Sequence, residues 1–360
     1  MKEMLPELLT MMAPGKPLRK GLDRIMDANL GVLMFFVEDA QKYIDTNVIQ
    51  LGFKIDIDFE SEKLYELAKM DGAIVLNRDG SRILYANVQL NTDSSIPSSE
   101  TGMRHRTAHK LAIQSQKLVI AVSKRRSTIS AFYGKEKYEL LSEAVLFSRL
   151  NQEITIAQRY KQNFYELIEV LNSEESSNTV SLYDVSEIIS KGLLTVRITQ
   201  RSEIYLKEMG DLAGSAYLEH REILSTVPKV LGAIIIDYTA SVPEFDSCEE
   251  ALSMFDSIKT ENLLDLFLIS QRLGYKKDSD EGLKETILTP RAFRLLYSTK
   301  LPQTSIKTII GKYENLTNLL NVSLDELSAI GGIGKRKARI ITSALMRKKM
   351  QNEFEGGSYQ

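Results

Sequence analysis

The apolar and polar residues of the first third of the chain alternate between strand-like and helical patterns. Continuous apolar runs predict buried strands, and the turn sequence Asn77-Arg78-Asp79-Gly80 predicts a hairpin between two of them. The expected strands cover residues 31–37, 73–76, 82–88, 118–123 and 128–133, and the expected helices cover about 61–69 and 107–116. The pattern predicts an α/β domain in which a mixed sheet is flanked by helices.

Beyond Gly134 the strand signals fade and the apolar residues fall at helical spacing. From Phe147 to Leu171 they recur every three or four positions, which predicts a long amphipathic helix. Further helical segments are expected at 184–191, 200–209 and 212–225, and on to residue 272. Short helices separated by turns at Leu301-Pro302 and Gly331-Gly332 follow the Thr289-Pro290 break. We therefore expect an α/β domain at 1–145, an all-α spacer at 146–287 and an all-α domain at 288–360.

Composition limits the class of protein. A chain of 360 residues is long enough for two or three domains. It contains no apolar run of the roughly 20 residues that a membrane helix needs, and its first residues lack a signal-peptide pattern. The single cysteine, Cys248, cannot form an intrachain disulfide or a zinc thiolate cage, and we expect it to be a buried small residue. These features favour a cytoplasmic protein with no membrane partner.

The net charge of −2 hides a strong segregation of charge along the chain. Residues 243–265 carry seven acids and one lysine, a pattern that we interpret as a solvated face. Residues 335–349 carry seven basic side chains and no acid. The basic segment is the part of the chain that would attract a polyanion.

The first candidate site surrounds Met70-Asp71-Gly72-Ala73, where a predicted helix ends and a strand begins. Gly72 would let a ligand approach the backbone closely. The Asp71 carboxylate could hold Mg²⁺ or accept a proton from an attacking hydroxyl. A turn aspartate that only caps its own loop is the alternative, and this segment by itself favours that alternative.

The second candidate is Arg104-His105-Arg106-Thr107, at the start of a predicted helix. Free backbone N–H groups, two guanidiniums and a hydroxyl there could cradle a phosphate, whereas the tripeptide alone is more often a solvated patch. His105 and His109 are four residues apart, but Arg106 stands where a zinc protease helix carries glutamate, so His109 is expected to be structural or exposed. The chain has no G-x-x-x-x-G-K-[ST] loop and no G-x-S-x-G nucleophile motif.

Taken together, Asp71-Gly72-Ala73 and Arg104-His105-Arg106, roughly thirty residues apart with the hairpin between them, resemble the diadenylate cyclase family. The resemblance implies that Asp71 activates a ribose 3′-hydroxyl and handles a metal ion, Mg²⁺ or Mn²⁺. It implies that Arg104, His105 and Arg106 contact the ATP phosphates. The other nucleotide-binding residues that it implies are Gly72, Leu90, Met103, Thr107 and Ser123. Where the family often has acidic residues after Ser123, this chain has Lys124-Arg125-Arg126, so the resemblance does not assign the contacts at the edge of the pocket.

Two ATP molecules would each attack the α-phosphate of the other. In-line positioning and charge stabilisation would do most of the catalytic work, and a divalent cation is expected. The product is two-fold symmetric, so two identical half-sites that face each other are the simplest arrangement. We therefore expect at least a dimer and an inactive monomer.

The basic C-terminal segment has the pattern of a helix, a glycine turn and a second helix. It resembles the helix-hairpin-helix motif, which binds DNA backbones without reading sequence; the alternative is a helical hairpin with a solvated basic face. Residues 294–320 resemble a degenerate second copy. The residues expected to contact DNA are Gly332, Gly334, Lys335, Arg336, Lys337 and Arg339.

The order of cyclase, helical spacer and helix-hairpin-helix resembles the bacterial DNA-integrity scanning family over essentially the whole chain. That resemblance implies an octamer, a nucleoid location, binding of branched DNA, and inhibition of the cyclase by that DNA. A DNA-binding scaffold that only senses ATP is one alternative function. A repair nuclease or ligase is another, but the sequence shows neither clustered carboxylates nor a nucleophilic lysine motif.

Overall fold

The structure is a computed structural model that describes residues 5–50, 52–124, 128–241, 245 and 247–356. The chain divides into two compact units. The first contains Met1–Asn151 and Glu203–Ala216, and the second contains Gln152–Ser202 and Tyr217–Gln360. Within the described residues, no helix combines the length and the apolar character needed to cross a membrane.

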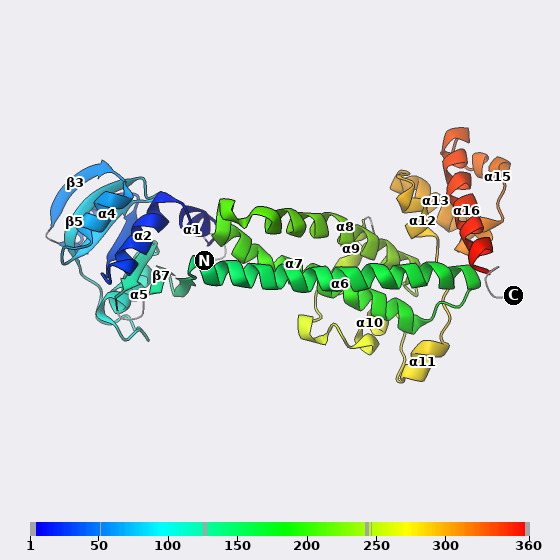
Figure 1. Ribbon diagram of the computed structural model, residues 1–360, viewed down its shortest axis with the longest axis horizontal. Helices are drawn as coiled ribbons and strands as arrows, with labels where there is room; N and C mark the ends of the chain where they lie inside the picture. The colour runs from blue at the N-terminus through cyan, green and yellow to red at the C-terminus, as the bar shows by residue number, and fades with distance from the viewer. Residues whose placement is uncertain (1–4, 51, 125–127, 242–244, 246, 357–360) are drawn as a thin grey trace. The chain divides into compact units, whose positions relative to one another are not determined.

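The first unit is built on one β-sheet, and helices from the N-terminal part of the chain pack against it (Figure 1). Its strands are β1 (Leu33–Val37), β2 (Ile49–Gln50), β3 (Phe53–Asp58), β4 (Ala73–Asn77), β5 (Arg82–Leu90), β6 (Val119–Ser123), β7 (Thr128–Tyr133) and β8 (Glu136–Leu140). Its helices are α1 (Leu5–Met11), α2 (Pro17–Asp27), α3 (Ala40–Asp45), α4 (Ser61–Leu67) and α5 (Met103–Ser115), followed later by the short 3-10 helix η1 (Gly210–Ala213).

The sheet is mixed, as the sequence predicts. Its strand order is β2-β5-β4-β1-β6-β7-β8, and β3 pairs with β5 as well. Strands β1 and β4 are parallel, with Leu33 opposite Ala73, whereas every other described pair is antiparallel. The fold class predicted for this part of the chain is confirmed.

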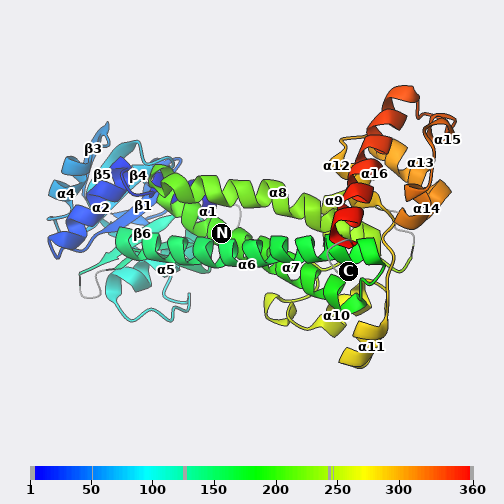
Figure 2. The same ribbon diagram turned by 45° about the vertical axis from the view of Figure 1, so that its right-hand side comes forward.

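The central strand β1 is buried on both faces, which explains its unbroken apolar sequence. Met34 and Phe36 face a core that α2 and α4 supply with Leu22 and Leu64. The alternate β1 residues face a second core, in which α5 supplies Ala108, Leu111 and Ala112. Figure 2 shows β1, β4 and β6 together with α2, α4 and α5. Helices on both faces thus fix the N-terminal end of α5 relative to the sheet.

The second unit contains most residues of three long helices. These are α6 (Glu143–Ser177), α7 (Leu182–Met209) and α8 (Gly214–Tyr238), which begin or end in the first unit by sequence. The predicted segments 184–191 and 200–209 are one continuous helix. The residues between them are buried except for the half-buried Arg197, so they show no wide polar face that would signal a helix. The helix predicted at 212–225 continues to Tyr238 through Pro228.

Shorter helices follow, and the α-helices among them share one hydrophobic core with the long ones. They are α9 (Cys248–Ser253), η2 (Thr260–Asn262), α10 (Leu266–Arg272), α11 (Asp280–Glu285), α12 (Phe293–Ser298), α13 (Gln303–Tyr313), α14 (Leu316–Leu320), α15 (Leu324–Ser328) and α16 (Lys335–Gly356). Cys248 is buried, as expected. Helices α12 to α16 pack together (Figure 2).

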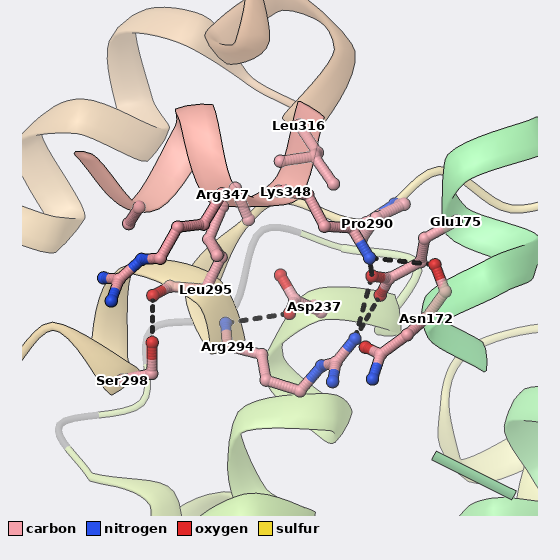
Figure 3. A pocket seen from close by; sticks show the side chains of 12 residues that line it. Asn172, Glu175, Asp237, Pro290, Arg294, Leu295, Ser298, Leu316, Arg347 and Lys348 are labelled. Carbon is pink, nitrogen blue, oxygen red and sulfur yellow. Dashed lines mark hydrogen bonds and ion pairs between the residues drawn. The ribbon is translucent and has the colours of Figure 1, made fainter. Parts of the chain in front are cut away.

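A buried ionic cluster joins α6, α8, α12 and α16 (Figure 3). Arg294 donates to both carboxylate oxygens of Glu175 at 2.8 Å, and Lys348 donates to the same carboxylate at 3.1 Å. The Tyr238 hydroxyl donates to Glu175 at 2.8 Å, and Lys348 also donates to the carbonyl oxygen of Asn172. The Glu175 side chain is only 4% exposed, so this carboxylate depends on these donors in place of water.

Asp237 completes the cluster by capping α12. Its carboxylate accepts hydrogen bonds from the backbone N–H groups of Phe293 at 2.6 Å and Arg294 at 2.9 Å. Burial and the nearby Glu175 carboxylate raise the pKa of Asp237 to about 7, against the effect of those donors. Burial also raises the pKa of Glu175, but the charges of Arg294 and Lys348 outweigh it and hold that pKa below its usual value.

Candidate active site

A cavity of about 640 Å³ opens where β4 begins, β5 ends and α5 begins. It brings together side chains that are far apart in sequence. Six of the predicted site residues line it, namely Asp71, Gly72, Leu90, Met103, Arg104 and Thr107. The other lining residues are Leu33, Gly52, Phe53, Ala73, Asn87, Val88 and Gln89.

Asp71 lies in the short connection between α4 and β4. Its side chain is exposed to the cavity, and within the described residues its carboxylate makes no hydrogen bond or ion pair. An aspartate that capped its own loop would bond to nearby N–H groups, as Asp79 does with the N–H of Ser81. The Asp71 carboxylate thus makes none of the contacts expected of a loop cap and faces the cavity.

The N-terminal end of α5 faces the same cavity. Its N-cap residue is Gly102, so no side chain caps the first turn, and the positive end of the helix dipole remains available to an anion. Met103, Arg104 and Thr107 of the first turns all line the cavity. Arg104 is exposed and brings a permanent positive charge to this helix end. The arrangement suits a phosphate group.

The remaining predicted residues lie away from the cavity. His105 is buried on the sheet side of α5, with its ring 6.0 Å from that of Phe132 in an edge-to-face arrangement. Arg106 is exposed, and its Nε donates to the carbonyl oxygen of Glu100 at 3.3 Å. The helical period explains this divergence, because consecutive residues at a helix start point in directions about 100° apart. The phosphate contacts assigned to His105 and Arg106 stay predictions.

Ser123 ends β6, opposite Thr128, and is half-buried outside the cavity lining. Lys124 is exposed, whereas Arg125 and Arg126 lie outside the described residues. His109 is half-buried, and its Nδ1 lies 2.9 Å from the Ser98 hydroxyl, which agrees with the structural role expected of it.

Gly31 lies behind the Arg104 side chain, a contact that the sequence did not reveal. A Cβ added to it would lie 2.9 Å from Nη1 of Arg104 and 3.1 Å from the carbonyl oxygen of Val122. The Arg104 guanidinium thus occupies space that exists only because residue 31 has no side chain. In the sequence Gly31 reads as the first residue of an apolar strand, and no local signal connects it to Arg104.

The side chains that line the cavity could hold Mg²⁺ only together with a bound nucleotide, because Asp71 is the one carboxylate among them. In the described part of the chain, no group of three His, Cys, Asp or Glu side chains is placed to hold a metal. Mg²⁺ commonly binds one or two carboxylates together with substrate phosphates and water. Asp71 supplies such a carboxylate, and the phosphates would complete the ligand set.

Comparison with known proteins places this chain in a family. Residues 19–137 match the family described as DisA bacterial checkpoint controller nucleotide-binding. A DNA integrity scanning protein DisA from Thermotoga maritima is 38% identical over 98% of this chain and 97% of its own length. The DisA of Carboxydothermus hydrogenoformans is 37% identical over 96% of this chain and 97% of its own length. The chain belongs to the DisA family.

The family assignment and the cavity fall in the same part of the chain. The DisA nucleotide-binding match includes every lining residue of the cavity. A second match, to the DisA bacterial checkpoint controller linker region, covers residues 140–281 and contains the long helices α6 to α8. The first unit therefore carries the nucleotide-binding domain of a DisA protein. The domain limits at 145 and 287 stay predictions.

Proposed function

We propose that this protein is a diadenylate cyclase that condenses two ATP molecules into cyclic di-AMP and two pyrophosphates. The proposal rests on one observation. The same cavity is lined by the Asp71 carboxylate, which has no hydrogen-bond partner among the described residues, and by Arg104 at the N-terminal end of α5. Each 3′-oxygen forms a bond to the α-phosphorus of the other ATP, the bond to the pyrophosphate leaving group breaks, and each hydroxyl releases one proton.

Asp71 accepts the hydroxyl proton or orients the hydroxyl for attack. Arg104 and the N–H groups at the start of α5 stabilise the negative charge that develops on the phosphoryl oxygens. A bound Mg²⁺ or Mn²⁺ would supply further charge neutralisation at the phosphates, with Asp71 as its protein ligand.

The reaction also requires a second copy of the chain. Each described chain offers one such cavity with one Asp71, whereas the product contains two equivalent linkages. Two cavities that face each other across a two-fold axis would align both attacks. Met103 is 86% exposed and Phe53 is 56% exposed beside the cavity, as expected of side chains that a facing copy would cover. We expect a homo-oligomer, an octamer by family resemblance.

The test is incubation of the full chain with ATP and Mg²⁺ or Mn²⁺, followed by chromatography of the products. The proposal requires cyclic di-AMP and two pyrophosphates per product molecule, formed by an oligomer. A scaffold that only senses ATP would bind ATP and release no pyrophosphate.

Gly31→Ala should slow cyclic di-AMP formation without unfolding the protein. The added methyl group displaces the Arg104 guanidinium, which can move because it is the end of a flexible side chain. Misplacement of a charged group by about 1 Å costs up to roughly 100-fold in rate, so we expect a loss of about 10- to 100-fold. The rate of product formation and the melting temperature check this. Gly311→Ala in α13 is the matched control, since a Cβ there also meets nothing within 4 Å and the residue lies outside the first unit.

We further propose that the C-terminal helices bind DNA and that branched DNA slows the cyclase. The names of the relatives, DNA integrity scanning protein, support this proposal. Gly331, Gly332 and Gly334 between α15 and α16 are exposed, and a Cβ at any of them would meet nothing within 4 Å, so the backbone is open to a phosphate. A slower rate with a four-way junction than with the same sequence as linear duplex is the expected result.

The exposed basic residues of α16 should set the salt dependence of DNA binding. Lys335, Arg336 and Arg339 are exposed, whereas Lys337 donates to the carbonyl oxygen of Gly332 at 2.8 Å and to Ser305, and so holds the turn in place. Changing Lys335, Arg336 and Arg339, the exposed basic residues next to the glycine turn, to glutamine should reduce the slope of log affinity against log salt by up to about 3. Fluorescence anisotropy titrations at several salt concentrations measure it.

A matched control changes three exposed lysines elsewhere in the second unit to glutamine, namely Lys259, Lys276 and Lys284. It removes the same charge at sites remote in sequence from the glycine turn. If both triple variants lower the slope equally, the effect comes from net charge, and the assignment of DNA binding to α16 is wrong.

A further inference from the structure

A β-bulge in β5 contributes Asn87 and Val88 to the lining of the cavity at Asp71. Ala73 of β4 pairs with Val88, but Val75 pairs with Tyr85, so two steps along β4 correspond to three along β5. The extra residue bends the strand, and Asn87 within it has a left-handed backbone with φ of 54°. A bulge beside a cavity commonly redirects one side chain, and here that side chain is the Asn87 carboxamide.

Two glycines enclose the bulge. A Cβ on Gly72 would lie 2.8 Å from the carbonyl carbon of Asn87 and 2.9 Å from its Oδ1. A Cβ on Gly52 would lie 2.7 Å from the carbonyl oxygen of Ala86 and 2.9 Å from that of Asn87. Both glycines have positive φ, 117° for Gly72 and 98° for Gly52. The close approach fixes Asn87 directly against the residue that follows Asp71.

The carboxamide of Asn87 makes no hydrogen bond that would stabilise the fold within the described residues. It is half-buried, it lines the cavity, and none of its hydrogen-bonding atoms is paired with a described residue. The left-handed backbone explains why asparagine or glycine is favoured here, but not why an amide lies in the cavity. Gln89, which lines the same cavity, in contrast donates to the Oδ1 of Asn91 at 3.3 Å.

We propose that Asn87 is a specificity-determining residue that binds a ribose hydroxyl of ATP and so selects ribonucleotides over 2′-deoxyribonucleotides. The inference rests on the proposed function, in which Asp71 acts on the 3′-hydroxyl. The 2′-hydroxyl is the neighbouring group on the ribose, and Asn87 lies against Gly72, next to Asp71 in sequence. A carboxamide both donates and accepts hydrogen bonds, as a hydroxyl does, so the two groups are complementary.

The test compares equilibrium binding of ATP and 2′-deoxy-ATP to the full chain by calorimetry, without divalent cations so that no turnover occurs. Asn87→Gly removes the carboxamide and still accommodates the positive φ, so the bulge is retained. The wild type should bind ATP more tightly than 2′-deoxy-ATP. The variant should lose about 3- to 10-fold in that preference, because ATP binding weakens and 2′-deoxy-ATP binding does not. Gln89→Ala, which removes an amide from the same cavity, should keep the wild-type preference.

Equal weakening of both nucleotides in Asn87→Gly would show that the residue only supports the bulge, and the inference would be overturned. A wild type without any preference would overturn it as well. The outcome is separable from that of the proposed function: a protein that prefers ATP through Asn87 yet forms no cyclic di-AMP retains the inference and loses the cyclase.

Discussion

Asp71→Asn should lower the rate of cyclic di-AMP formation by about 100- to 10,000-fold, the range that a positioned acid–base group contributes. Asparagine has nearly the same size but neither accepts a proton nor neutralises a divalent cation. The Asp71 carboxylate makes no hydrogen bond with the described residues, so the fold should not depend on it. The change should therefore lower the activity without lowering the stability of the fold.

The rate is measured by chromatography of the product, and folding is measured by thermal melting of the same preparation. Glu66→Gln is the matched control, since it removes an exposed carboxylate of α4 whose partner is the exposed Lys69. We expect the control to retain the wild-type rate. An Asp71→Asn protein that retains the wild-type rate would refute the catalytic role of Asp71. One with a much lower melting temperature would show that Asp71 is structural.

The sequence predicted two kinds of element well: those with one buried and one exposed face, and those that are buried on both faces. The buried strand β1 and the turn at Gly80 were predicted because their signals are local. Strand β3 was missed because it lies at the edge of the sheet and none of its residues is buried, so it has no apolar run. Strand β8 was missed for the same reason, with only Leu140 buried.

Helix lengths were underestimated where burial is complete. Most residues in the middle of α7 are buried, and Gly192 there lies so close to Leu231 and Phe164 that a Cβ would be within 3.0 Å of both. A helix that is buried around most of its circumference has no alternation of apolar and polar faces, so the sequence pattern that indicates a helix is lost there. Pro228 interrupts the sequence signal of α8, although the helix continues because its buried face is held by the core.

The site was predictable only in part, because some of its residues are brought together only by the pairing and packing of strands in the folded sheet. Asp71 and Arg104 were recognised from motifs and their spacing. Gly31 and Asn87 have no motif of their own. Their roles depend on the contact of Gly31 with Arg104 and on the register of β4 against β5, and neither can be read from local sequence.

The buried cluster around Glu175 leads to the largest expected effect on stability. Glu175→Ala would leave the Arg294 and Lys348 charges buried without their carboxylate, with side chains that are only 19% and 7% exposed. Breaking a buried pair by removing one partner costs about 3 to 5 kcal/mol. The unpaired charges lie on α12 and α16, so we expect these helices to loosen first.

Native-state hydrogen exchange of the full chain is the suitable measurement, because it reports on individual helices of a protein with more than one unit. Amides of α12 and α16 should exchange faster in Glu175→Ala, while those of β1 and β6 should not change. Glu261→Ala is the control, since its pair with Lys259 is exposed and such pairs contribute about 1 kcal/mol or less. Unchanged protection of α12 and α16 would mean that the apolar core alone holds them.

A triple replacement of Glu175, Arg294 and Lys348 by methionine tests the physical origin of this effect. If the cost in Glu175→Ala comes from unpaired buried charge, removing all three charges together should restore most of the lost protection, because buried ion networks are often no more stabilising than apolar side chains of similar volume. If the triple variant is as loose as Glu175→Ala, directional bonds are what hold α16 to α6, namely those that Lys348 donates to Glu175 and to the carbonyl oxygen of Asn172.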